Sequence, residues 1–241
     1  MKNNITIFFL LWSILIYSQI SVKVSYETVY QPNKINYNGF KIPETQKEEI
    51  ERQVAQDNKK PRKFVLYYEN GNSFFQNDPS ENLPSTKQKT EYYRLKNKNG
   101  IYRLSDYLVE EFYGYYPMNN VDIEFTNETQ TIENYNCKLA LYKNGNNISK
   151  VWYTEDIPIS AGPYNYYKVP GLILKVENSK LTCYAVNVSK NVNKNDIKKM
   201  NPELKVYEGD ELEKKNDEGK EKMLGNSRQR AEEMMKSLQK N

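Results

Sequence analysis

Histidine is absent from this 241-residue sequence, and cysteine occurs only twice. Without histidine, the chain has no Ser-His-Asp or Cys-His catalytic couple, no imidazole general base and no histidine-ligated zinc site. Two cysteines cannot form a four-thiolate metal site. The sequence also lacks a glycine-rich phosphate-binding loop. We therefore assign no catalytic, metal-binding or cofactor-binding residue, and we expect no cofactor.

Arginine is scarce, at six of the 35 basic residues, and the formal net charge is only +4. A chain so close to charge balance creates no strong field for nucleic acid. The guanidinium group of arginine is also the side-chain group best suited to hydrogen-bond phosphates and bases. The composition therefore argues against a nucleic-acid partner.

A long apolar run occurs at residues 5–17, after Lys2 and before Ser18 and Gln19. A basic start, a short apolar segment and a small, polar junction are typical of a secretory signal peptide. The run is shorter than the roughly 20 residues that a membrane-spanning helix needs. A retained anchor or a buried helix is the alternative. We expect cleavage after Gln19, export from the cytosol, and a mature chain that is not an integral membrane protein.

Export changes the interpretation of Cys137 and Cys183. In an oxidising compartment, two cysteines most simply form one disulfide. Such a bridge would stabilise the fold by about 4 kcal/mol on the chain-entropy model. Two separate buried thiols are an equally weighted alternative, because a sequence does not give the distance between two Cα atoms.

Apolar and polar residues alternate with a period of two through most of the chain, which is typical of strands with one buried face. The candidate strands are residues 20–26, 121–125, 137–141, 148–154, 172–176 and 181–188. Tight antiparallel turns are predicted at the Asn-Gly dipeptides 70–71, 99–100 and 144–145, and at residues 177–180. The predicted fold class is mainly β (α+β). We expect an antiparallel meander of about eight strands in a curved sheet or partial barrel, with one or two minor helices.

Two polar segments interrupt the strand pattern. Residues 48–56 have a helical composition, and residues 76–90 contain two prolines and predict a mobile loop. We expect residues 20–207 to form a single β-rich domain. The charged tail, residues 208–241, is expected to be mostly disordered, with a short helix at residues 227–239.

Residues 152–176 contain the densest set of backbone constraints in the chain. Pro170 fixes its own φ and keeps Val169 extended, whereas Gly171 can adopt a positive φ. Residues 169–172 therefore predict a type II turn, with proline second and glycine third.

The turn would lead Leu172 and Ile173 into a strand that is apolar on both faces, which indicates a central strand covered on both sides. Gly162, followed by Pro163, is a second constraint, because a missing side chain lets a neighbouring segment approach closely.

This segment resembles the signature of the GLPGLI family, which comprises exported envelope proteins of Gram-negative bacteria with no established activity. The resemblance is carried by Trp152-Tyr-Thr, Ile157-Pro158, Ala161-Gly162-Pro163-Tyr164, Val169-Pro170-Gly171-Leu172-Ile173, the leader and a Tyr-x-Cys-x-x-Ala segment beginning at Tyr135. It departs from the family at Lys168 and Val169, which replace glycine and leucine. The resemblance implies a β-rich fold and a periplasmic or outer-membrane-associated location.

The first functional hypothesis is a non-catalytic structural or binding component of the envelope. The chain has 21 tyrosines, and residues 112–117 and 164–167 concentrate aromatic side chains near glycine or proline. Such clusters suit contact surfaces for envelope proteins, a peptide or a hydrophobic ligand. Tyrosines that simply fill half-buried sheet positions are the competing interpretation.

The alternative hypothesis is a carboxylate-dependent hydrolase. Glu110 and Glu111, and likewise Glu155 and Asp156, are adjacent acidic residues, and paired carboxylates can divide acid and base roles. Neighbouring residues of a strand point to opposite faces, so neither pair converges by itself. The sequence therefore favours a non-enzyme.

Overall fold

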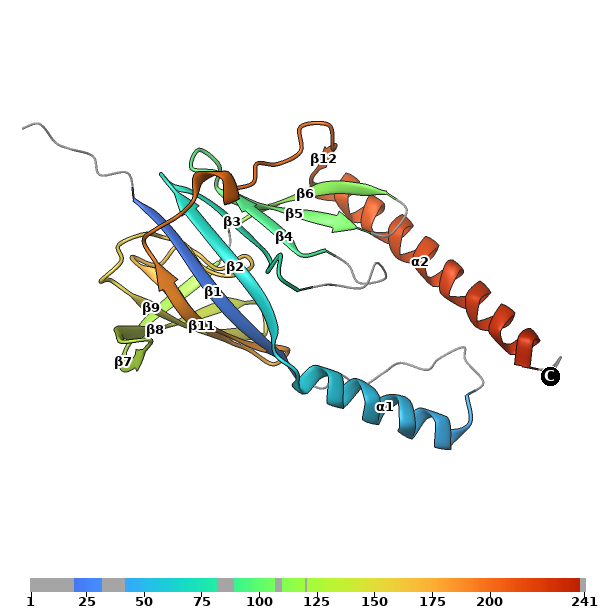
Figure 1. Cartoon of the computed structure of the whole chain (residues 1–241). Helices are drawn as coiled ribbons and strands as arrows, with labels where there is room; N and C mark the ends of the chain where they lie inside the picture. Colours follow the sequence, from blue (N-terminus) through green and yellow to red (C-terminus); the bar gives the residue numbers. More distant parts are fainter. Residues whose placement is uncertain (1–19, 32–41, 82–88, 107–109, 120, 239–241) are drawn as a thin grey trace, which may run out of the picture.

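The computed structural model describes residues 20–31, 42–81, 89–106, 110–119 and 121–238, so the predicted leader at residues 1–19 lies outside the described residues. The elements along the chain are β1 (Ser21–Tyr30), α1 (Glu44–Lys59), β2 (Arg62–Glu69), β3 (Asn72–Asn77), β4 (Glu91–Arg94), β5 (Gly100–Asp106), β6 (Glu111–Pro117), β7 (Asp122–Ile132), β8 (Tyr135–Asn144), β9 (Asn147–Thr154), β10 (Leu172–Glu177), β11 (Leu181–Ser189), a 3₁₀ turn η1 (Lys194–Asp196), β12 (Val206–Tyr207) and α2 (Gly209–Leu238). Figure 1 shows one curved sheet from which both helices extend toward the same side.

The twelve strands form one sheet in the order β12-β6-β5-β4-β3-β2-β1-β11-β10-β9-β8-β7. Strands β1 to β6 form a first meander and β7 to β11 a second, and the two meanders join where β1 pairs with β11. Every neighbouring pair is antiparallel except β12 and β6. The predicted mainly β, antiparallel and curved fold is confirmed. The sheet has more strands than expected.

The period-two pattern located the strands of the second meander and β1 correctly. The predicted turns at residues 70–71 and 144–145 are also present, and Asn70 and Gly71 take positive φ angles of 50° and 93°. The dipeptide at residues 99–100 differs, because Gly100 opens β5 instead of forming the turn. A Cβ on Gly100 would lie 2.6 Å from the carbonyl oxygen of Tyr116, so this glycine permits close strand packing.

The largest hydrophobic cluster contains side chains from both meanders. Val24, Tyr26 and Phe64 from the first meander pack with Leu139 and Leu174 from the second. A second cluster covers the other face of β2 to β6, where apolar residues between 192 and 204 pack over it. A third covers the other face of β8 to β10. Leu172, Ile173 and Leu174 are fully buried, so the predicted central strand, covered on both sides, is present.

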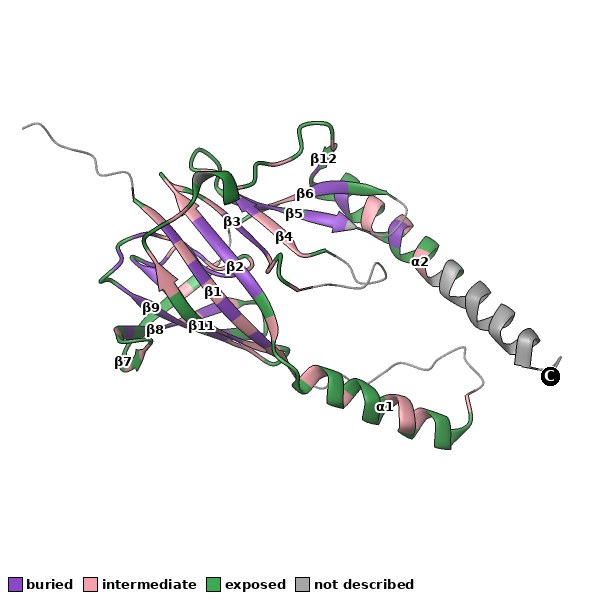
Figure 2. Cartoon of the chain, viewed as in Figure 1, coloured by how far each residue is buried: buried purple, intermediate pink, exposed green. Residues whose placement is uncertain are grey.

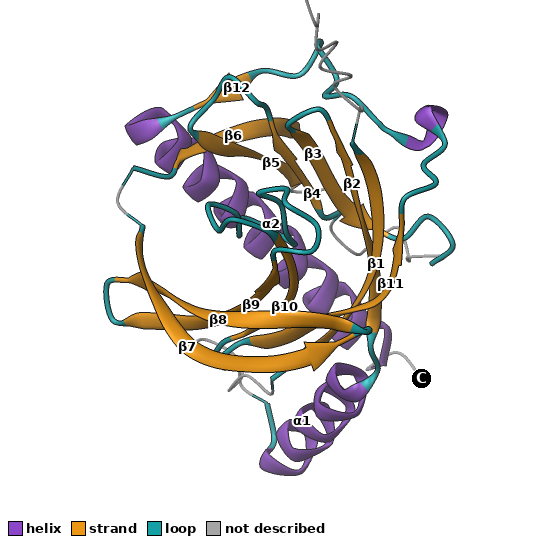
Figure 3. Cartoon of the chain, turned by 90° about the vertical axis from the view of Figure 1, so that its left-hand side faces the viewer, coloured by secondary structure: helices purple, strands orange, loops and turns teal. Residues whose placement is uncertain are grey.

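The segment that joins β9 to β10, residues 155–171, forms an inner loop between the two meanders. In Figure 3, loops drawn in teal lie on the inner side of the curved sheet. The backbone of the inner loop is attached to β10, because the N–H of Leu172 donates to Ile157 at 3.0 Å and that of Ile173 donates to Ala161 at 2.9 Å. Its Tyr164 reaches the first meander, with ring centroids 4.7 Å from Phe75. The inner loop thus fills the inside of the curve.

The prediction of positive φ at Gly171 is wrong, and the reason for the glycine is different. The left-handed residues near it are Tyr164 and Lys168, with φ angles of 55° and 71°. A Cβ on Gly171 would lie only 2.0 Å from the carbonyl oxygen of Thr154. Gly171 is therefore required because the chain entering β10 passes directly against the end of β9.

Lys168 occupies the position where the GLPGLI signature has glycine, and it adopts the backbone conformation that glycine favours. Its N–H donates to Ser160 Oγ at 2.9 Å, and its Nζ donates to the Met118 carbonyl. These two hydrogen bonds offset a left-handed conformation that costs an L-residue about 1–2 kcal/mol. The close approach expected at Gly162 is also present, because a Cβ there would lie 2.7 Å from Ile173.

Cys137 and Cys183, both among the described residues, are free and buried, so the structure contains no disulfide between them. They lie on β8 and β11, which are separated in the sheet by β9 and β10. Three strand spacings of about 4.8 Å exceed the Cα separation that a disulfide spans. Burial raises the pKa of Cys137 to about 11 and that of Cys183 to about 12. The alternative of two separate buried thiols is confirmed.

The charged tail differs from the expected disordered segment, because α2 already begins at Gly209. Leu212 is 4% exposed and packs with Phe112 and Tyr207, which anchors the first turns of α2 against β6 and β12. The low apolar content of the tail gave no sign that a single leucine would pack against Phe112 and Tyr207. Helix α1 extends beyond the predicted residues 48–56 and buries no side chain (Figure 2). No helix in the described part of the chain is long and apolar enough to cross a membrane.

Candidate functional site

The residues selected from the signature segment lie together around the inner loop, but they serve packing. Trp152, Val169, Leu172 and Ile173 are each less than a tenth exposed. Gly162 and Gly171 sit where neighbouring atoms leave no room for a side chain. Pro163 is buried and Pro170 is exposed at the end of the same loop. The arrangement fixes the path of the loop and presents no reactive group.

The structure does not bring the four predicted carboxylates together. Glu110 and Glu111 lie at the start of β6, where they pair with Lys215 at 3.7 Å and with Lys89 at 2.7 Å. Glu155 pairs with Lys138 at 2.7 Å on the exposed end of β9. Asp156 lines a cavity, without a second carboxylate among the lining residues. This arrangement provides no acid-base pair of the kind that divides hydrolytic roles.

The tyrosines of the two tyrosine-rich segments proposed as contact surfaces are buried or half-buried. Tyr113 is 2% exposed, and Tyr167 is 4% exposed. Tyr164 contacts three aromatic rings and donates its hydroxyl to Thr28 Oγ1 at 3.0 Å. The interpretation that tyrosine fills sheet and core positions therefore describes these segments.

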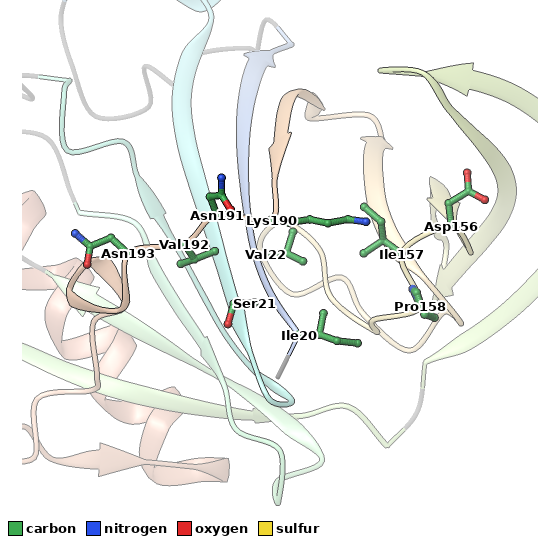
Figure 4. Close-up of a pocket in the computed structure, with 10 residues that line it drawn as sticks. All are labelled: Ile20, Ser21, Val22, Asp156, Ile157, Pro158, Lys190, Asn191, Val192 and Asn193. Carbon is green, nitrogen blue, oxygen red and sulfur yellow. The ribbon is translucent and has the colours of Figure 1, made fainter. Parts of the chain in front are cut away.

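A cavity of about 830 Å³, which we call cavity 1, opens beside the beginning of β1. Its apolar wall includes Ile20, Val22 and Ile157, and its polar groups include Asp156 and Lys190. Figure 4 shows Lys190 extending toward Ile157, between β1 and the first residues of the inner loop. Neither Asp156 nor Lys190 has an ion-pair partner among the described residues. Cavity 1 thus offers one free donor group and one free acceptor group beside an apolar wall.

A smaller cavity of about 270 Å³, cavity 2, lies between the β8–β9 turn, the β10–β11 turn and the inner loop. Its lining includes the side chains of Asn147, Asn165, Tyr166 and Asn178. Asn165 and Tyr166 belong to the segment 164–167 that the sequence singled out as a candidate contact surface. Asn147 and Asn178 were not predicted as site residues, because they come from two other segments and asparagine near the turns was interpreted as turn chemistry.

A third cavity of about 370 Å³ lies over the aromatic side chains of Tyr67, Phe74 and Tyr93. Residues 197–200 form its other wall, and Arg94 lies at one side. The Arg94 guanidinium stacks at 4.7 Å on the ring of Tyr167 and donates to the carbonyl of Gly71. Arg94 is therefore already used in packing the first meander against the inner loop. No group of three or more potential metal ligands occurs among the residues that the structure describes.

The family described as "N-glycanase peptide, N-terminal domain" matches residues 55–215, about two thirds of the chain. No curated protein matches. Two solved structures of PNGF-II are similar, one in space group C2 with a TM-score of 0.54 and one in P21 with a TM-score of 0.53. Both are 18% identical in sequence, and the match covers 83% and 82% of this chain but 32% and 33% of the PNGF-II chain. The chain therefore spans about a third of the length of these structures, and at this identity the likeness shows the fold.

The match corrects the interpretation of the chain as a non-catalytic GLPGLI envelope component with a structural or binding role, and it is closer to the hydrolase alternative. The GLPGLI resemblance rests mainly on residues 152–176, whereas the N-glycanase match extends over residues 55–215. The shorter segment consists of proline, glycine and buried apolar positions that fix the inner loop. These residues determine only the local path of the backbone. Two proteins that share such a path need not belong to the same family.

Proposed function

We propose, from the premise that this chain belongs to the N-glycanase peptide N-terminal domain family, that it works in the hydrolytic removal of N-linked glycans from glycoproteins. The family match over residues 55–215 is the observation that carries this proposal. We assign to this chain the task of holding the glycosylated peptide, with cavity 1 as the binding site.

The chemistry of cavity 1 supports binding of a glycopeptide. The Asp156 carboxylate accepts hydrogen bonds from sugar hydroxyls or peptide N–H groups, and the Lys190 ammonium donates to hydroxyl or carbonyl oxygens. Val22 and Ile157 provide apolar surface for the carbon face of a sugar ring or for a peptide side chain. A peptide partner, which the sequence suggested, is thus retained as part of the substrate.

The positions of the carboxylates favour a role of this chain in binding the glycopeptide over a role in cleaving its glycan bond. In hydrolysis by paired carboxylates, two such groups flank the scissile bond and lie about 5–10 Å from each other. Glu155 forms an ion pair with Lys138, and Asp156 is the one carboxylate among the described residues that line cavity 1. We therefore assign the bond-breaking groups to a part of the enzyme other than the described residues of this chain.

We further propose that the chain acts outside the cytosol, in the periplasm or at the outer membrane. The support for this location is the apolar run at residues 5–17, preceded by Lys2 and followed by Ser18 and Gln19. Mass analysis of the periplasmic fraction is expected to find a chain that begins at Ile20. Full-length protein in the cytosol would contradict the location.

The binding proposal is tested by titrating the full chain with a peptide that carries one N-glycan and with the same peptide after glycan removal. We expect the glycosylated form to bind at least tenfold more tightly. Asp156→Ala and Lys190→Ala should each weaken this binding about fivefold or more, because each removes one charged hydrogen-bonding group. The matched control is Glu155→Ala, next in sequence but outside cavity 1, which should leave binding unchanged.

Equal affinity for the two peptides would refute a role in glycan recognition. Release of free glycan by the chain alone, detected by mass spectrometry, would contradict the division between holding and cleavage.

A further inference from the structure

Cavity 2 has a lining chemistry that differs from that of cavity 1. Two hairpin turns form its rim, at residues 144–147 and 177–180, and Asn165 and Tyr166 of the inner loop face it. Its lining residues include no carboxylate and one basic residue, Lys180. Most of its polar groups are neutral amides and hydroxyls. This composition suits a neutral ligand that carries several hydroxyl or amide groups.

A network of hydrogen bonds holds one wall of cavity 2 in place. The Tyr166 hydroxyl lies 2.8 Å from Ser149 Oγ, and it accepts a hydrogen bond from Asn178 Nδ2 at 3.1 Å. Asn178 Oδ1 in turn accepts from the N–H groups of Lys180 and Leu181. The inner loop, strand β9 and the β10–β11 turn are thereby fixed to one another, so the wall is formed before any ligand binds.

Other polar groups of cavity 2 have unused hydrogen-bonding capacity. The side-chain amides of Asn144, Asn147 and Asn165 are exposed and make no hydrogen bond within the described part of the chain. Tyr142 also lines the cavity and is only 5% exposed, so it contributes its ring while its hydroxyl is buried beside the backbone of Tyr167. The three free amides are therefore the groups of this wall that can donate to and accept from a ligand.

Apolar groups complete the cavity on its other side. The Tyr142 and Tyr166 rings meet edge to face with centroids 5.4 Å apart. Met118, Val121 and Ile148 add aliphatic surface, and Ile148 is 55% exposed. A sugar ring has the matching chemistry, because its hydroxyls lie at the edge and its C–H groups form an apolar face. The volume of about 270 Å³ is near the lower limit of small-ligand sites, which suits one sugar unit rather than a long chain.

We propose that cavity 2 is a saccharide-binding site that takes one neutral sugar unit, an N-acetylhexosamine of the glycan. The site itself rests on the lining groups described above, and the choice of an N-glycan sugar rests on the function proposed for cavity 1. Asn147 and Asn165 recognise the sugar hydroxyls and the acetamido group, and the rings of Tyr142 and Tyr166 provide apolar surface for the sugar. The two cavities would then hold different parts of one glycopeptide.

The test uses nuclear magnetic resonance titration of the full chain with N-acetylglucosamine and with N,N′-diacetylchitobiose. The side-chain amide signals of Asn147 and Asn165 are expected to shift on addition of either sugar. The double variant Asn147→Ala/Asn165→Ala should weaken binding at least tenfold. The matched control, Asn127→Ala/Asn136→Ala, removes two exposed asparagines of β7 and β8 that line neither cavity 1 nor cavity 2, and it should leave sugar affinity unchanged.

Tyr166→Phe provides an independent variant, because it keeps the ring and removes only the hydroxyl that joins Ser149 and Asn178. We expect it to weaken sugar binding at least threefold while the Asn127→Ala/Asn136→Ala control melts and binds as the parent chain does. Equal sugar affinity in the parent chain and the Asn147→Ala/Asn165→Ala variant would overturn the proposal. So would an absence of binding by both sugars at 50 mM, a ligand concentration chosen to be on the order of a weak Kd.

The outcomes for the two cavities are distinguishable. If cavity 2 variants lose sugar binding but the glycosylated and bare peptides bind equally, the saccharide site stands and the proposed function fails. If the glycosylated peptide binds through Asp156 while the Asn147→Ala/Asn165→Ala variant retains full sugar affinity, the proposed function stands and the saccharide site fails.

Discussion

At the scale of single residues, the glycines of this chain serve two different physical needs. Gly145 has a positive φ of 56° and open space around the position of a Cβ. Gly171 lacks a left-handed φ, but a Cβ there would meet the Thr154 carbonyl oxygen at 2.0 Å. The first glycine relieves backbone strain, and the second lets β9 and β10 approach each other at the base of the inner loop.

Gly171→Ala and Gly145→Ala are therefore expected to differ in their effect on stability. The alanine at position 171 must displace the backbone of Thr154, which we expect to lower the free energy of unfolding by about 3 kcal/mol or more. At position 145 only the left-handed conformation is penalised, by about 1 kcal/mol. Urea denaturation of the two variants measures the difference. Equal losses would mean that β9 does not crowd Gly171.

At the scale of elements, the inner loop is the segment that holds the two meanders together. Tyr164 contacts Phe64, Phe75 and Tyr92 of the first meander, with ring centroids 4.7–5.8 Å apart. Its hydroxyl donates to Thr28 Oγ1 on β1. Ile157, Ile159 and Ala161 are buried in the same cluster, so the loop acts as a core element although it has no regular secondary structure.

Two substitutions at Tyr164 separate its ring from its hydroxyl. Tyr164→Phe removes the hydrogen bond to Thr28 and should cost about 1 kcal/mol. Tyr164→Ala also removes the contacts with three rings and should cost about 3–5 kcal/mol. Phe125→Ala is the control, because Phe125 is 54% exposed on β7 and its loss should change stability by less than about 1 kcal/mol. A Tyr164→Ala variant as stable as this control would show that the loop does not join the meanders.

The elements also show which features the sequence could predict. Strand β1 was found because its alternation of apolar and polar residues requires one buried face. In β4 and β6, runs such as Tyr92-Tyr93 and Tyr115-Tyr116 place tyrosine on both faces, so the period of two disappears. The turn at Glu133 and Asn134 contains no glycine although both residues have positive φ, so it carried no turn signal.

The candidate site was harder to predict than the strands, for a geometric reason. Cavity 1 combines the start of β1, residues 156–158 and residues 190–193, and cavity 2 combines two hairpin turns with the inner loop. Local patterns give no distance between such segments. Asp156 was singled out as half of an acidic pair, but its neighbour Glu155 faces Lys138. The helical start of the tail could not be predicted for the same reason. Leu212 packs against Phe112 of β6 and Tyr207 of β12, and no local pattern places these three residues together.

At the scale of the whole molecule, the interior depends on acidic groups that remain neutral. Burial raises the pKa values of the Tyr26 and Tyr164 hydroxyls well above 10.0. Burial likewise raises the pKa of the Cys183 thiol from 9.0 to about 12 and that of Cys137 to about 11. These side chains come from both meanders and from the inner loop. Alkaline pH therefore acts on the junction of all three parts at once.

The sign of the pH dependence follows from the direction of these pKa shifts. A group whose pKa is higher in the folded chain contributes full stability below its unfolded pKa, and that contribution is lost as the pH rises toward the folded value. We expect the urea midpoint to be constant from pH 7 to about 8.5 and to fall steeply above about pH 9.5, since the unfolded thiols and phenols ionise there. For Cys183 alone, one pH unit above the unfolded pKa corresponds to about 1.4 kcal/mol. Cys183→Ala should therefore show a shallower decline between pH 9 and 10.5 than the parent chain, whatever its stability at pH 7. Parallel curves for the two proteins, or a midpoint that does not fall by pH 10.5, would mean that ionisation of the buried core is not what limits the folded state in alkali.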